Sequence, residues 1–275
     1  MIPLLLAALL AITSAPASGN EIATHGGGTV AIESRGATLH AILWRPTGTG
    51  SFPAVLFLHG SSPTFPPRRT ALGPLFARHG YVFLFLFRRG AGLSASAGEE
   101  SGAVMARELS RGGEEARNAV QLRLLETADF ADAKAGLAYL RGLPGVDRRR
   151  VAVVGHSYGG SLSLLLAEAE PELGAVVDFA GAANSWAKNP ELRERLVAAV
   201  DRISVPVLFL HAENDYSTAP GEALAAEMEK RRKPHSLKIY PPLGSTAVDG
   251  HDLVYSGVPR WESDVFGFLD AGLRR

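Results

Sequence analysis

A serine lies between two glycines at the middle of the chain, in the run Gly155-His156-Ser157-Tyr158-Gly159, which fits the pattern G-x-S-x-G. The apolar, mostly β-branched block 151–154 precedes it and is typical of a strand buried on both faces. A leucine-rich stretch from Ser161 onward follows it and indicates a buried helix. A serine on such a sharp turn adopts a strained backbone and leaves no room for neighbouring Cβ atoms. The pattern therefore predicts a hydroxyl raised above a sheet, beside the free N–H groups of a helix N-terminus.

A serine hydroxyl is a poor nucleophile until a base removes its proton, and the base needs an acceptor that fixes its tautomer. In sheets of alternating strands and helices, these groups occur along the chain as serine, acid, histidine. Asp215 follows an apolar strand and His251 follows the last one, so both satisfy that order. We expect Ser157 to be the nucleophile, His251 the base and Asp215 the acid that orients the base.

Two other carboxylates compete for the acid role. Asp178 lies inside the run Val176–Phe179, where structural hydrogen bonds are the simpler explanation, and Glu213 precedes Asp215 by two residues. A turn aspartate can also bond its own backbone, and a loop histidine can simply be solvated.

Acyl transfer also requires N–H donors for the developing oxyanion. The backbone N–H of Tyr158 begins the helix after the nucleophile, and the loop after the strand at 53–58 offers Ser61, or Ser62, as the second donor. His59 and Arg88 follow strand ends and are the candidate substrate-binding residues, with Arg88 and its neighbour Arg89 suited to a carboxylate on the substrate. His59 and His156 flank the site, and we expect both to be supporting hydrogen-bonders rather than bases. For Arg88 the alternative is that it anchors the following loop by ion pairs.

The elements that must position these residues are short apolar strands separated by helices. The six continuous apolar runs are 53–58, 81–87, 151–154, 175–179, 206–210 and 237–240. An antiparallel hairpin, Thr29–Glu33 with Ala37–Trp44, precedes them at the sheet edge. This order predicts the α/β class, with a mostly parallel sheet of about eight strands covered by helices on both faces. Ligands in such sheets bind at the carboxyl ends of the strands.

The segment from about residue 94 to 126 has an unusual composition, in which small and charged residues surround Gly112-Gly113. We expect two short helices, Val104–Arg111 and Glu114–Glu126, which form a small cover over the sheet. Their apolar residues could line an acyl pocket or pack onto the scaffold; these are Val120, Leu122, Leu124 and Leu125. Thr127 is the expected N-cap of the next helix, which runs to Arg141.

Composition and the N-terminus bound the possible functions. The 28 basic and 28 acidic residues cancel, so nothing favours a nucleic-acid partner, and the absence of cysteine excludes a disulfide or a thiolate site. Pro3–Ile12 is apolar and is followed by Ala15-Pro16-Ala17, the pattern of a cleaved secretory signal. We expect a signal peptide at 1–19 and one catalytic domain at 20–275. The mature protein should be secreted or periplasmic, without stable membrane insertion.

The chain resembles the α/β-hydrolase superfamily, and in particular its dienelactone-hydrolase-like branch. The matching segments are Leu58-His59-Gly60, Arg89–Ser94, Gly155–Gly159, His211–Asp215 and Gly250-His251. The resemblance implies the α/β-hydrolase fold and a serine carboxylester hydrolase for small to medium acyl esters, without metal or organic cofactor. Dienelactone hydrolases proper use a cysteine nucleophile, whereas this chain has Ser157. The alternatives are an acyl-aminoacyl or dipeptidyl-type serine peptidase, and a non-catalytic binding module on the same scaffold.

Overall fold

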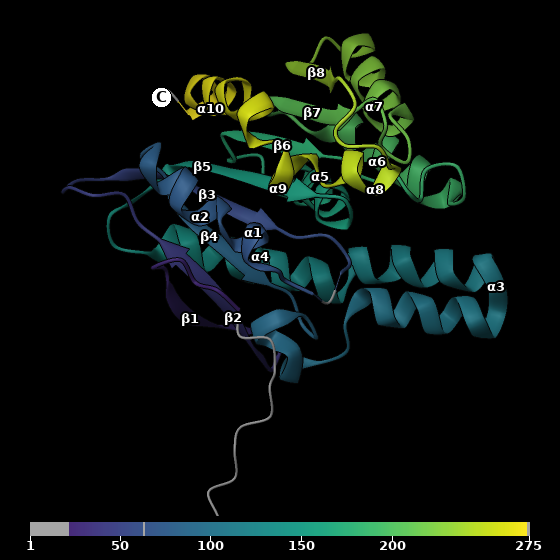
Figure 1. Ribbon diagram of the computed structural model, residues 1–275, viewed down its shortest axis with the longest axis horizontal. Coiled ribbons are helices and arrows are strands. Elements are labelled where there is room, and N and C mark those ends of the chain that lie inside the picture. The colour runs from purple at the N-terminus through teal and green to yellow at the C-terminus, as the bar shows by residue number, and fades with distance from the viewer. Residues whose placement is uncertain (1–21, 63, 274–275) are drawn as a thin grey trace, which may run out of the picture.

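The computed structural model describes residues 22–62 and 64–273, so the expected signal peptide lies outside the described residues. Eight strands form one sheet in the order β1-β2-β4-β3-β5-β6-β7-β8 (Figure 1). Strands β1 and β2 form the edge hairpin, which pairs antiparallel with β4, and all later pairs are parallel. The predicted sheet is therefore confirmed. The strands are β1 (Gly28–Ser34), β2 (Ala37–Trp44), β3 (Phe52–Leu58), β4 (Val82–Phe87), β5 (Val146–His156), β6 (Ala175–Phe179), β7 (Val207–Ala212) and β8 (His235–Tyr240).

Helices cover both faces of the sheet because its central strands are apolar on both sides. Along β5, Val151 and Val153 pack into one buried cluster, and Ala152 and Val154 pack into the other. The first cluster lies under α3 (Ser101–Glu126), α4 (Ala128–Gly142), α5 (Tyr158–Ala169), α6 (Pro190–Arg202) and α7 (Ala219–Lys230). The second lies under α2 (Leu72–Arg78), α9 (Leu253–Ser256) and α10 (Val258–Leu273). The remaining short helices are α1 (Pro67–Thr70), the 3₁₀ helix η1 (Gly92–Ala97) and α8 (Ala247–His251).

Helix α3 is a hairpin of two arms, which project beyond the sheet (Figure 1). The arms meet at Gly113, whose φ of 71° and ψ of −163° are not helical. The structure thus places a break where the sequence predicts one, although the first arm begins at Ser101. Hydrogen bonds tie the second arm to the segment after β6, from Gln121 Nε2 to Ser185 Oγ (3.0 Å) and from Asn118 Nδ2 to the Lys188 carbonyl.

The apolar residues of α3 pack onto the scaffold. Val120 and Leu125 are buried in the first cluster. Leu122 lines a cavity of about 650 Å³ together with Pro190 of α6, and no residue of the expected triad lines that cavity. Packing, the second of the two alternatives, accounts for these side chains.

A few local predictions differ from the structure. Thr127 precedes α4 as expected, but its hydroxyl donates to the Arg123 carbonyl and therefore does not cap the helix. His251 ends the short helix α8 and does not lie in a loop. Among the described residues, no helix combines the length and apolarity needed to cross a bilayer.

Candidate active site

Ser157 lies on the sharp turn between β5 and α5, with φ 57° and ψ −117°. A positive φ is unfavourable for a residue with a Cβ atom and marks local strain. The positions on both sides of this turn have no room for a Cβ atom, so both must be glycine. A Cβ atom at Gly155 would lie 2.2 Å from the Gly159 carbonyl oxygen, and one at Gly159 would lie 2.0 Å from the Leu58 carbonyl oxygen. The G-x-S-x-G pattern therefore forms the strained turn that the sequence predicts.

The imidazole of His251 joins the serine to a buried carboxylate. Its Nε2 lies 2.9 Å from Ser157 Oγ, and its Nδ1 lies 2.7 Å from Asp215 Oδ1. Because a carboxylate only accepts, Nδ1 carries the proton and Nε2 accepts from the serine hydroxyl. The three residues follow β5 and β7 and end α8, so the carboxyl edge of the sheet brings them together, as predicted.

The short helix α8 is fixed at its start by a capping box. The Thr246 hydroxyl accepts from the Asp249 N–H, while the Asp249 carboxylate accepts from the Thr246 N–H. At its other end the Nε2–H of His156 donates to the His251 carbonyl at 2.8 Å. Burial lowers the pKa of His156 well below the usual value, so this ring is neutral and acts as a brace. Reciprocal caps and this bond give His251 a rigid support.

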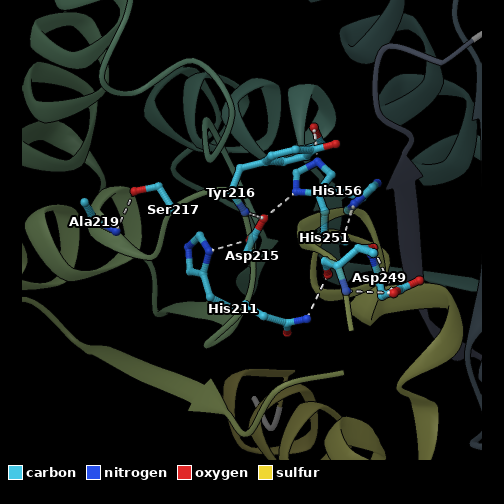
Figure 2. A network of polar contacts seen from close by, with 11 residues as sticks. His156, His211, Asp215, Tyr216, Ser217, Ala219, Asp249 and His251 are labelled. Atoms are coloured by element: carbon cyan, nitrogen blue, oxygen red, sulfur yellow. Dashed lines mark hydrogen bonds and ion pairs between the residues drawn. The ribbon is translucent and has the colours of Figure 1, made fainter. Parts of the chain in front are cut away.

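Asp215 is fully buried and accepts from two imidazoles and a backbone amide. Oδ2 lies 2.9 Å from His211 Nδ1, and Oδ1 also accepts from the Tyr216 N–H at 2.7 Å. Figure 2 shows the carboxylate between the rings of His211 and His251. Burial alone would raise the pKa of Asp215, but the hydrogen bonds from the two histidines outweigh burial and lower it to about 2. The carboxylate is therefore ionised at neutral pH.

The loop after β3 passes directly over the nucleophile. A Cβ atom at Gly60 would lie 3.3 Å from the Cβ of Ser157. The Ser61 N–H next to it donates to no other group of the described chain. The Tyr158 N–H is the first of α5 and has no acceptor within the helix. Gly60 thus borders the serine, and neither predicted donor amide has an acceptor among the described residues.

The prediction that His59 and Arg88 bind substrate is wrong, because neither side chain reaches the surface. His59 is 0% exposed and Arg88 is 1% exposed. The guanidinium donates to the His59 carbonyl at 2.6 Å and to the Gly60 carbonyl at 3.1 Å, and it lies 5.0 Å from the centre of the Tyr158 ring. His59 Nδ1 in turn contacts the Gly60 carbonyl at 2.6 Å. Both side chains therefore hold the loop over the nucleophile in place through its carbonyl groups.

The competing acids do not contact His251. Asp178 is buried beneath the nucleophile turn, where it accepts from the Gly181 N–H, and burial raises its pKa to about 7. Glu213 is exposed, and its backbone N–H pairs with the Tyr240 carbonyl. Arg89, the neighbour of Arg88, forms the loop-anchoring ion pair, at 2.6 Å to Asp132.

Comparison with known proteins decides the family. A model of the dienelactone hydrolase family matches residues 40–245, well over half of the chain. The chain belongs to the dienelactone hydrolase family. Its fold and the hydrolase character of its relatives agree with the resemblance found in the sequence.

This dienelactone hydrolase family member is 26% identical over 234 residues to the quorum-quenching protein AidA of Acinetobacter baumannii. That match covers 83% of this chain and 62% of the relative, so the chain spans less than two thirds of the relative's length. Among solved structures, Pyrococcus horikoshii acylaminoacyl peptidase aligns with a TM-score of 0.66 at 18% identity, over 90% of this chain and 42% of the peptidase.

Two solved proteins of similar size share the fold of the family member. Est1E from Butyrivibrio proteoclasticus, solved with ferulic acid, has a TM-score of 0.60 at 20% identity, covering 86% of this chain and 98% of Est1E. A dienelactone hydrolase from Klebsiella pneumoniae has a TM-score of 0.58 at 19% identity, covering 84% of this chain and 98% of its own. At these identities the likeness concerns the fold.

Two residues beside Asp215 in this family member contact the relay, although no motif in the sequence gives them a role. His211 bonds the far oxygen of the carboxylate, and the Tyr216 ring lies 4.9 Å from the His251 ring while remaining 44% exposed. Their positions in the sequence, four residues before and one after the acid, held the only available signal.

Proposed function

We propose that this chain is a serine carboxylester hydrolase for small to medium acyl esters. One observation carries the proposal, namely the unbroken line of hydrogen bonds from Ser157 through His251 to Asp215. The line gives a weak nucleophile both a base within reach and a charge that stabilises the imidazolium formed during the reaction. The family assignment supports hydrolysis as the reaction class.

In the proposed reaction, Ser157 Oγ bonds to the ester carbonyl carbon as its proton passes to His251 Nε2. The electron pair of the carbonyl moves to oxygen, where the N–H groups of Tyr158 and Ser61 would stabilise the charge. The tetrahedral intermediate then expels the alcohol, which takes the proton from His251. A water molecule then attacks the acyl-enzyme carbonyl as its proton passes to His251 Nε2. The second tetrahedral intermediate expels Ser157 Oγ, which takes the proton back from His251 as the carboxylic acid is released.

Hydrolysis of amides is the second candidate, because the fold is similar to that of acylaminoacyl peptidase. An amine is a poorer leaving group than an alcohol and makes a stronger demand on proton donation by His251. Paired esters and anilides with the same acyl group separate the two reactions. We expect a large preference for the ester, and a comparable kcat/KM on the anilide would favour the peptidase.

The decisive experiment replaces the nucleophile and a matched serine one helical turn later. Ser157→Ala should abolish hydrolysis of p-nitrophenyl acetate and butyrate and labelling by a fluorophosphonate probe. Ser161→Ala should retain both, because the Ser161 hydroxyl is buried and makes no hydrogen bond to any residue that the structure describes. Retained activity in Ser157→Ala would refute the assignment, and a wild-type protein that resists the probe would favour a binding module.

Export to the periplasm or medium completes the proposal and has its own test. The support for it is the apolar run Pro3–Ile12 followed by Ala15-Pro16-Ala17. Expression of the full chain in a bacterial host should yield a processed protein whose N-terminus lies near residue 20 in the periplasmic fraction. Recovery of only the unprocessed chain with the cytoplasmic fraction would contradict export.

A further inference from the structure

His211 is a buried histidine that the proposed reaction does not use. It lies near the end of β7, four residues before Asp215, and its side chain is fully buried. Its Nδ1 lies 2.9 Å from Asp215 Oδ2, the oxygen that faces away from His251. The carboxylate thus bridges two imidazoles, each bound to a different oxygen (Figure 2).

The surroundings of His211 fix which nitrogen carries the proton. Nε2 is buried and makes no hydrogen bond among the described residues. It faces Gly221 of α7, where a Cβ atom would lie only 2.7 Å from it. A proton on Nε2 would leave a buried donor unpaired and turn the bare Nδ1 towards a carboxylate, which is repulsive. The neutral ring protonated at Nδ1 avoids both costs.

Few charged groups face this ring from the elements around it. Besides Asp215, Asp178 of β6 interacts electrostatically with His211, and His251 of α8 binds the other oxygen of Asp215. From α7 and β8 the neighbouring groups are Gly221 and Leu237, which carry no charge. The hydrogen bond to Asp215 is therefore the main polar contact through which His211 can act.

We propose that His211 is a positioning residue, which holds the Asp215 carboxylate in the orientation that presents Oδ1 to His251. The inference rests on the proposed function, since it concerns the same line of hydrogen bonds. A buried carboxylate bound on one side only could rotate about its terminal bond, and a small misplacement of reacting groups has a large effect on rate. Anchoring of the second oxygen prevents that rotation.

The hydrogen bond from His211 to Asp215 also weakens the effect of the Asp215 charge on His251. By donating to Oδ2, His211 draws charge from the carboxylate and weakens its attraction for a proton on His251. Loss of the donor should therefore strengthen the interaction of the carboxylate with the imidazolium and move the acid limb of the kcat/KM profile to higher pH. A residue that only fills space would leave this limb unchanged.

The test compares His211→Leu, which removes the donor, with His211→Asn, whose amide can donate from about the same place as Nδ1. We expect kcat on p-nitrophenyl acetate to fall on the order of 10- to 100-fold in His211→Leu, with KM changed less than about twofold. His211→Asn should recover most of the loss. Val207→Ala, a packing defect on the same face of β7, should keep both the wild-type kcat and the wild-type pH profile.

Two kinetic outcomes would overturn the inference. One is a His211→Leu variant with wild-type kcat and acid limb, and the other is an equal loss in the Leu, Asn and Val207→Ala variants, which would indicate packing alone. If His211→Leu does not fold, the ¹⁵N histidine spectrum of the wild-type protein decides the question. It should show His211 as the Nδ1–H tautomer, and an Nε2–H tautomer would refute the inference. That spectrum is independent of activity, so it stands even if Ser157→Ala refutes the proposed function.

Discussion

Arg88 offers a sharp test of how the loop over the nucleophile is held in place. Its buried guanidinium donates to the carbonyls of His59 and Gly60. Within a trans peptide the C=O and N–H point in opposite directions, so a fixed Gly60 carbonyl also fixes the Ser61 N–H on the side away from Arg88. Arg88→Met keeps much of the side-chain volume but removes both donors.

The size of the effect follows from these two hydrogen bonds. Removing Arg88 leaves the buried His59 carbonyl without its side-chain donor, at about 1–3 kcal/mol. It also takes one of two donors from the Gly60 carbonyl, which keeps His59 Nδ1, and relief from burying a charge offsets part of the loss. We expect Arg88→Met to lower the free energy of unfolding by about 3 kcal/mol. If the Ser61 N–H also moves away from the oxyanion, kcat should fall by about 100-fold, the usual cost of one lost donor.

Urea unfolding followed by tryptophan fluorescence gives the stability, and hydrolysis of p-nitrophenyl acetate gives kcat and KM. Arg89→Met is the matched control, because Arg89 pairs with Asp132 and makes no bond to the loop over the nucleophile. This variant should lose stability while kcat remains near that of the wild type. If Arg88→Met kept wild-type stability and raised KM only for a substrate with a carboxylate in its acyl group, the argument would be refuted. Arg88 would then be a substrate-binding residue after all.

Two further variants test the space and the charge beneath the nucleophile. Gly159→Ala would place a Cβ atom 2.0 Å from the Leu58 carbonyl oxygen, so we expect a loss of about 3 kcal/mol in urea unfolding, whereas Gly267→Ala, with open space around it, should be neutral or slightly stabilising. Asp178 keeps a proton in the folded state up to about pH 7, whereas an unfolded carboxyl loses it near pH 4, so the unfolding free energy should fall as pH rises between these values. Asp178→Asn should flatten that slope, and an unchanged slope would show that Asp178 does not cause it.

The sheet was predictable because continuous apolar runs have few alternatives in an α/β chain. Each of the six runs became a strand, and glycine at 155 and 159 marked a turn where backbone atoms approach too closely for a side chain. The order of Ser157, Asp215 and His251 was enough to select three residues that the structure brings within hydrogen-bond distance. Strand-end position and chain order are properties of the sequence itself.

By contrast, the sequence does not show in which direction a side chain at the end of a strand points. His59 and Arg88 follow β3 and β4 in the way that a substrate-binding residue would. Whether such a side chain points outward or beneath the loop depends on what covers it, and here Phe65 packs edge-on against the His59 ring at 4.8 Å. Both residues lie in the loop between β3 and α1. No strand or helix periodicity in that loop indicates the contact.

The histidines near the site show which physical property distinguishes a general base from a histidine that only supports its neighbours by hydrogen bonds. Four of the eight lie close to the nucleophile or its acid: His59, His156, His211 and His251. Burial lowers the pKa of His59 and His156, so neither can readily take up a proton. His211 has one nitrogen bonded to Asp215, and the other has no hydrogen-bond partner in the described part of the chain. His251 alone among the four combines hydrogen bonds at both nitrogens with partial exposure, which lets it take a proton from the serine and exchange protons with a water or an alcohol. Desolvation, rather than residue type or position, therefore divides the four roles.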